Sequence, residues 1–123
     1  MHIAIVGSRR FKNRRQVEDL VRSLPAGTVV VSGGCHGPDN WAEVAAKEQR
    51  LETAIFLPKM PPDGSPDYEY TKAYYGRNFW IAKMCDELHA FVSKTRTGGT
   101  ENTIKVARQL GRRIVLHQEA PEK

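Results

Sequence analysis

Glycines at the ends of predicted strands are the residues of this sequence best suited to bind an anion. The β-branched run Val29–Val31 predicts a buried strand, and Ser32-Gly33-Gly34 follows it directly. The chain then turns through Gly37 into a helix that we expect to start at Asp39, with Asp39 as its N-cap. Glycine allows a ligand to approach the backbone, and a helix N-terminus carries about half a positive charge. This stretch therefore predicts a phosphate-binding turn.

Two other glycine-bearing turns have the same character. Gly7-Ser8-Arg9 follows the apolar run 3–6, and Thr97-Gly98-Gly99-Thr100 separates a predicted strand from a predicted helix. The guanidinium of Arg9 could bind a phosphate through two hydrogen bonds, and the hydroxyls of Ser32 and Thr100 could donate to one. The alternative interpretation is structural: tight turns without a ligand, and hydroxyls that cap nearby backbone groups.

Apolar periodicity predicts the elements that must position these turns. We expect strands at 3–6, 28–32, 54–58, 87–93 and 114–117, helices at 13–24, 39–50, 71–85 and 101–110, and a long loop at 59–70. Alternating strands and helices indicate an α/β protein with a three-layer αβα Rossmann-like fold, about five parallel strands and the order 3-2-1-4-5. Ligands in such sheets bind where the strand order reverses, here between the first and fourth strands. A single domain is expected over 1–117, with a tail at 118–123.

The composition favours an anionic partner. The 123 residues carry a net charge of +5, and the pI is about 9.4. There is no apolar run long enough for a membrane span and no signal-peptide pattern, and two cysteines make no disulfide framework, so we expect a cytoplasmic protein. Cys35-His36 lacks zinc-ligand spacing, and neither a metal nor a cofactor is expected. The usual dinucleotide and P-loop motifs are also absent.

Several short motifs occur along the chain in a fixed order. They are Gly7-Ser8-Arg9, Ser32-Gly33-Gly34-x-x-Gly37-x-Asp39-x-x-Ala42, Leu57-Pro58, Arg77-Asn78, Ala90-Phe91 and Gly99-Thr100-x-Asn102-Thr103-Ile104. Their order and spacing resemble the SLOG superfamily of Rossmann-like proteins. Within that superfamily the sequence is most similar to the small YspA or DUF2493 group, which is related to YpsA. The resemblance to LOG phosphoribohydrolases and DprA/Smf DNA-processing proteins is more distant.

The resemblance implies a nucleotide or nucleotide-derived ligand, including NAD-derived signalling nucleotides, and a homo-oligomer. It leaves open whether the protein is an enzyme. LOG hydrolases place a catalytic glutamate one helical turn after their Gly-Thr, and this sequence has Thr103 there. Glu101 is out of phase with that position. The candidate catalytic residues are therefore Arg77, Glu101 and Glu43, with Asp39 as a further carboxylate.

Three functions follow as alternatives. The first is a module that senses or sequesters a nucleotide, the second an N-glycosidic hydrolase of nucleoside monophosphates, and the third a DprA-like single-stranded DNA-binding protein. The tyrosines near the 59–70 loop could stack on a base or close a core. We also expect Gly34→Val to abolish ligand binding in a folded protein. The expected ligand-binding residues are Gly7, Ser8, Arg9, Ser32, Gly33, Gly34, Gly37, Asp39, Arg77, Asn78, Gly98, Gly99, Thr100 and Asn102.

Overall fold

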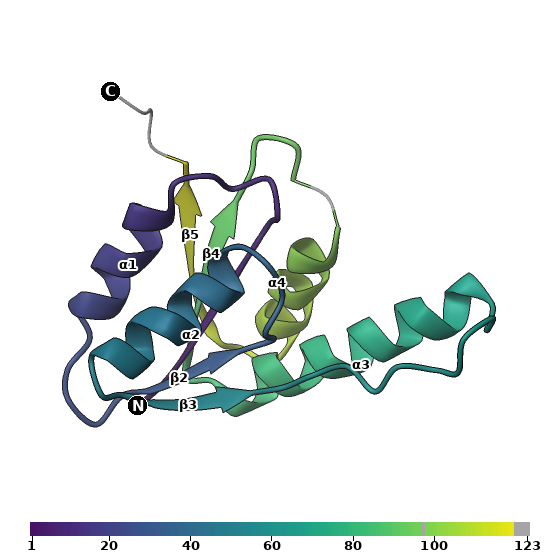
Figure 1. Ribbon diagram of the computed structural model, residues 1–123, viewed down its shortest axis with the longest axis horizontal. Helices are drawn as coiled ribbons and strands as arrows, with labels where there is room; N and C mark the ends of the chain where they lie inside the picture. Colours follow the sequence, from purple (N-terminus) through teal and green to yellow (C-terminus); the bar gives the residue numbers. More distant parts are fainter. Residues whose placement is uncertain (97, 120–123) are drawn as a thin grey trace.

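The computed structural model describes residues 1–96 and 98–119, which form a five-stranded parallel sheet with four helices (Figure 1). The strand order is β3-β2-β1-β4-β5, so the predicted order 3-2-1-4-5 is confirmed. The strands are β1 (His2–Gly7), β2 (Val29–Ser32), β3 (Glu52–Ile55), β4 (Glu87–Val92) and β5 (Arg113–Gln118). The helices are α1 (Arg14–Arg22), α2 (Pro38–Glu48), α3 (Asp67–Met84) and α4 (Gly99–Gln109).

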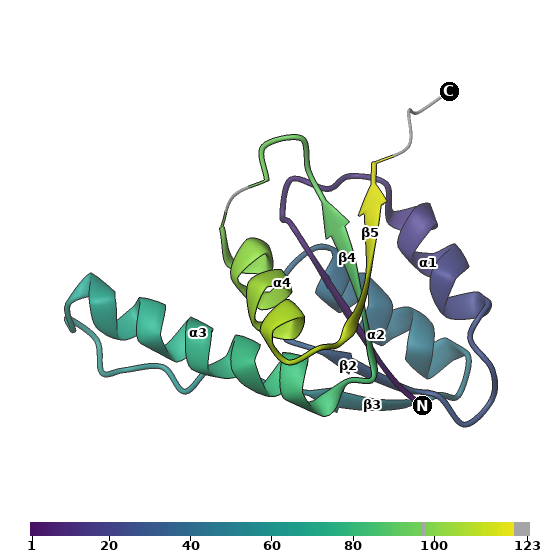
Figure 2. The ribbon, with the colours of Figure 1, turned by 180° about the vertical axis from the view of Figure 1, so that it is seen from behind.

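The sheet is covered on both faces, because successive residues of a strand point in opposite directions. In β1, Ile3 and Ile5 pack with α1 and α2, whereas Ala4 and Val6 pack with α3 and α4. Figures 1 and 2 show these two helix pairs on opposite sides of the strands. The continuous apolar runs of the sequence thus serve two cores, and the expected three-layer α/β architecture is confirmed.

The bounds of one helix and one strand differ most from the sequence-based prediction. Helix α3 begins at Asp67 rather than 71, after Pro66 as N-cap, so the expected 59–70 loop ends four residues early. Two acidic residues in the first turn, Asp67 and Glu69, favour this early start through the helix dipole. Strand β3 covers 52–55 rather than 54–58 because its partner β2 ends at Ser32, which pairs with Ile55.

The C-terminal tail also begins later than predicted. Gln118 belongs to β5 and pairs with Val92, so it is not part of a tail. The carboxylate of Glu119 accepts backbone hydrogen bonds from Lys12 and Asn13, which attaches the end of β5 to the start of α1. The rest of the predicted tail, 120–123, lies outside the described residues, as does Thr97 of the second glycine turn.

Within the described ranges, no helix is both long and apolar enough to cross a membrane. The same residues contain no group of three histidine, cysteine, aspartate or glutamate side chains that could hold a metal ion.

Candidate functional site

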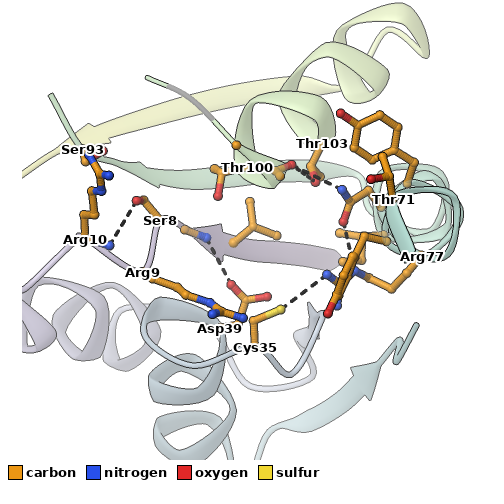
Figure 3. A pocket seen from close by; sticks show the side chains of 18 residues that line it. Ser8, Arg9, Arg10, Cys35, Asp39, Thr71, Arg77, Ser93, Thr100 and Thr103 are labelled. Carbon is orange, nitrogen blue, oxygen red and sulfur yellow. Dashed lines mark hydrogen bonds between the residues drawn. The ribbon is translucent and has the colours of Figure 1, made fainter. Parts of the chain in front are cut away.

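A cavity of about 500 Å³ lies at the carboxyl end of the sheet, between the ends of β1 and β4 (Figure 3). Helix α1 follows β1 on one face of the sheet and α4 follows β4 on the other, so this is the point where the strand order reverses. Its volume is in the range of small-molecule sites. The cavity is lined by Val6, Gly7, Ser8, Arg9, Arg10, Cys35, Asp39, Thr71, Tyr74, Tyr75, Arg77, Asn78, Ile81, Ser93, Gly98, Gly99, Thr100 and Thr103.

Asp39 joins the ends of the neighbouring strands β1 and β2. Its Oδ1 accepts the N–H of Gly7 at 3.1 Å, and its Oδ2 accepts the N–H of Gly33 at 3.1 Å. The predicted N-cap role of Asp39 is therefore wrong: Gly37 is the N-cap of α2, with Pro38 at the first helical position. The carboxylate turns inward instead because the ends of β1 and β2 present two amides that need an acceptor.

Burial makes Asp39 a weaker acid than an exposed aspartate. Desolvation of the carboxylate raises the pKa of Asp39 from 3.8 to about 6, against the opposing effects of the Gly33 amide, the Arg77 charge and the Gly7 amide. A carboxyl group with such a pKa in the wall of a cavity is characteristic of functional sites.

The raised pKa of Asp39 can be tested directly. In a carbon-13 NMR titration, the chemical shift of the Asp39 carboxyl carbon should change with a midpoint near pH 6. The pKa of Asp39 is higher in the folded state than in the unfolded state, so protonation of Asp39 stabilises the folded state. This stabilisation is fully present below about pH 4. It is lost as the pH rises through about 6. A midpoint near 3.8, the pKa of aspartate without burial, would contradict the burial argument.

Arg77 is the buried cation of the site, with only 9% of its surface exposed. Its Nη1 donates to the Gly33 carbonyl at 2.7 Å, Nε to the Asn78 side chain at 2.9 Å, and Nη2 to Cys35 Sγ at 3.4 Å. These contacts use three of the five guanidinium N–H donors, and none of the three acceptors is a carboxylate. The Tyr74 ring lies 5.7 Å from the guanidinium carbon. Arg77 is thus held rigidly by these contacts. Its positive charge acts on the Asp39 carboxylate, but the two side chains are too far apart to form an ion pair.

The N-terminus of α4 forms the opposite wall. Its N-cap is Gly98, which provides no side-chain hydrogen bond, so the first amides of the helix have no side-chain cap. Asn78 fixes this helix end: its Nδ2 donates to the Gly99 carbonyl at 3.3 Å and to Asn102 Oδ1 at 3.1 Å. Figure 3 shows Ser8, Asp39 and Thr100 around the same space, with Arg77 on the α3 side.

The structure brings together some of the predicted ligand-binding residues and separates others. Lining the cavity are Gly7, Ser8, Arg9, Asp39, Arg77, Asn78, Gly98, Gly99 and Thr100. Ser32, Gly33, Gly34, Gly37 and Asn102 are not among its lining residues.

The first two amides of the turn after β2 are therefore not free, contrary to expectation. The Gly33 N–H is bonded to Asp39, and the Gly34 N–H points to Ser32 Oγ at 3.5 Å. A Cβ on Gly33 would lie 2.6 Å from Arg77 Nη1, so glycine is needed there for side-chain packing. The positive charge near this turn comes from a side chain, not from bare backbone.

Gly34→Val is consequently a poor test of ligand binding. Gly34 has a φ of +70°, which disfavours any side chain, and its Cβ would lie 3.2 Å from Ile55 Cγ2. The substitution would strain the fold at a position outside the cavity, contrary to the expectation of a folded protein.

The two glutamates considered for catalysis lie away from the cavity lining. Glu43 pairs with Lys47 at 2.7 Å on α2. Glu101 makes two hydrogen bonds to Arg96, at 2.8 and 3.0 Å. The carboxylate that does line the cavity is Asp39, and both of its oxygens already accept backbone amides.

Sequence reasoning did not place Arg10, Cys35, Thr71, Ser93 and Thr103 in the site, although they line the cavity. Ser93 at the end of β4 could have been found from the rule that strand ends share one edge. Cys35 and Thr71 carry no such signal, because their positions depend on how α3 crosses the sheet.

Fold and cavity together define a doubly wound parallel α/β protein with a site at its switch point. No family model matches the chain, and no curated protein sequence matches it significantly. Among solved structures, the chain is similar to DNA processing protein A (DprA) from Streptococcus pneumoniae, with a TM-score of 0.75 and 20% sequence identity. The similarity covers 94% of this chain and 49% of the DprA chain, so this chain spans about half the length of that protein.

Proposed function

We propose that the protein binds a nucleotide or nucleotide-derived ligand in this cavity, as a sensor or sequestering module. The observation that carries the proposal is the pairing of a rigid, buried Arg77 with the uncapped N-terminus of α4 across one cavity. Arg9 and Arg10 line the same space, so its cations outnumber its one carboxylate. Such a site favours an anion.

The phosphate is assigned to the α4 side of the cavity. There the first amides of the helix and the Thr100 hydroxyl can donate to it, while Arg9 approaches from the end of β1. The base is assigned to the α3 side, where Tyr74 and Tyr75 line the cavity and offer ring faces for stacking. Tyr74 is already oriented by its contact with Arg77.

Binding is favoured over hydrolysis because a free carboxylate opposite Arg77 is missing from the described cavity lining. To separate the two functions, the protein is mixed with AMP, GMP, CMP and NAD, and binding is measured by calorimetry and released base by chromatography. We expect binding without release. AMP should bind at least about 10-fold more tightly than adenosine, because the phosphate makes the charge-assisted hydrogen bonds. Base release at a catalytic rate would establish the hydrolase instead.

Gly99→Val should weaken this binding without unfolding the protein. Gly99 has an ordinary φ, and the nearest atom to an added Cβ is Asn78 Nδ2 at 3.9 Å, so no contact in the described chain requires glycine. The added side chain would occupy cavity space beside the helix amides. Calorimetry should show at least about a 10-fold loss of affinity, the size of one charge-assisted hydrogen bond. The far-ultraviolet circular dichroism should be unchanged, and full affinity in the folded variant would refute the phosphate assignment.

Single-stranded DNA binding is a second candidate, favoured by the fold shared with a DNA-processing protein. The exposed Arg9, Arg10, Lys12, Arg14 and Arg15 follow β1 next to the cavity mouth. If DNA is the ligand, an oligothymidine should be retarded in a gel at low salt, and Arg14→Ala and Arg15→Ala should weaken that binding roughly uniformly. These substitutions should leave nucleotide binding in the cavity unaffected. Absence of retardation would remove this candidate.

A further inference from the structure

Exposed apolar side chains are concentrated on one arm of the molecule. Helix α3 and the segment before it extend past the sheet in both views (Figures 1 and 2). Ten large hydrophobic side chains are exposed in the described residues, and seven belong to this arm: Leu57, Met60, Tyr68, Tyr75, Phe79, Trp80 and Met84. Exposed apolar surface gathered in one place is characteristic of an interaction site.

Gly76 lies in the middle of α3 on this exposed surface. Glycine weakens the interior of a helix relative to alanine. An added Cβ at Gly76 would meet nothing within 4 Å, and its backbone has an ordinary helical φ. Contacts within the described chain therefore do not account for glycine here. Close approach of another backbone would account for it, since small residues at a crossing point let two helices pack at short distance.

The charged and aromatic residues of α3 are arranged symmetrically around Gly76. Glu69 lies seven residues before it and Lys83 seven residues after it, while Lys72 and Trp80 lie four residues on either side. Spacings of three and four residues place this set on one helix face, opposite the buried residues 77, 78, 81 and 82. Across the described chain, neither Glu69 nor Lys83 has an ion-pair partner; Lys83 Nζ lies over the rings of Phe79 and Trp80.

An antiparallel second copy of α3 satisfies this arrangement. With the two helices crossing at Gly76, each Glu69 faces the Lys83 of the other copy, and each Lys72 faces a Trp80 ring. The antiparallel direction also sets the acidic first turn of each helix against the basic last turn of its partner. A groove of about 540 Å³ lies on this face, between Glu69, Lys72, Gly76 and Trp80 of α3 and the preceding segment with Leu57 and Met60. The groove can receive side chains of the second copy at the crossing point.

We propose that two copies of this chain associate through α3, antiparallel and crossing at Gly76, with Glu69 and Lys83 paired at both ends of the contact. The interface leaves the cavity accessible from each copy, because Thr71 and Tyr75, which line the cavity, lie on a different face of α3 from Glu69, Gly76 and Lys83. This inference does not depend on the identity of the ligand.

The test is sedimentation equilibrium of the full chain over a concentration series. The wild-type protein should give twice the 13.9 kDa chain mass. Glu69→Lys or Lys83→Glu alone should raise the dissociation constant of the dimer at least about 10-fold, and the double exchange should restore it to within about 3-fold of wild type. The matched controls Glu48→Lys and Lys105→Glu, on exposed positions of α2 and α4, should have no effect.

Gly76→Gln tests the crossing point itself. Glutamine is a good helix former and meets open space in the single chain, so the variant should fold and be monomeric. A wild-type protein that is monomeric throughout the series would overturn the proposal. A dimer that survives Gly76→Gln, or one whose double charge exchange fails to restore association, would equally overturn it.

Discussion

Replacing Arg77 with methionine should lower the affinity for the best-binding nucleotide by about 10- to 100-fold. A hydrogen bond involving a charged group contributes about 1.5–3 kcal/mol, and methionine fills similar space without any donor. The same change leaves the Gly33 carbonyl without its 2.7 Å donor and Asp39 without its nearest described cation. We therefore also expect the pKa of Asp39 to rise above its value of about 6, which carbon-13 NMR would measure.

Two variants make this result interpretable. Arg77→Lys keeps the charge but cannot reach the carbonyl, amide and sulfur acceptors together, so it should recover only part of the affinity. Arg15→Met removes an exposed arginine outside the cavity lining and should change neither affinity nor the Asp39 titration. If Arg77→Met binds nucleotides like wild type while the Asp39 pKa rises, Arg77 is a structural residue and the ligand assignment is wrong.

Gly7→Ala should be the most destabilising single methyl addition in this region. The new Cβ would lie 2.5 Å from Cβ and Cγ of Pro38 and 3.0 Å from the carbonyl oxygen of Phe91. Neither neighbour can move easily, since Pro38 is a rigid ring that opens α2 and Phe91 belongs to β4, which is held between β1 and β5. We expect a loss of about 3 kcal/mol in the free energy of unfolding, measured by urea denaturation.

Gly99→Ala is the matched control for this prediction. Both glycines line the cavity and neither has a positive φ, but the Cβ at Gly99 comes no closer than 3.9 Å to another atom. Its free energy of unfolding should stay within about 0.5 kcal/mol of wild type. Equal effects of the two alanines would show that the close packing of α2 on β1 is not what requires glycine at position 7.

These expectations concern the same residues that the motif spacing singled out, but for different reasons. Gly7 and Gly33 resemble a phosphate-binding backbone when read along the chain. In the fold, Gly7 makes room for Pro38, and Gly33 makes room for Arg77 and Asp39. Both amides donate to one carboxylate. The packing partners that require glycine at both positions belong to distant segments of the chain, which the motif spacing does not reveal.

The sequence by itself determined the architecture of this protein. Two-sided apolar runs such as 3–6, alternating with helical periodicity, require a parallel sheet covered on both faces, and the rule that parallel strand ends share an edge locates the cavity. Local composition also misled twice. The proline-rich segment before Asp67 indicates a loop, so the predicted start of α3 was too late. Asp39 precedes an apolar pattern of helical spacing, as N-caps commonly do, but the N-cap of α2 is Gly37.

Only the tertiary structure decided where the charges act. Arg77 belongs to a helix whose pattern gives it no sign of burial, and it becomes a site residue because α3 crosses the sheet beside Gly33. Asp39 turns inward because two strand ends, 26 residues apart in the chain, present amides at the same place. Such contacts depend on strand register and helix packing, which no local stretch of sequence encodes, and the desolvation that raises the Asp39 pKa follows from them.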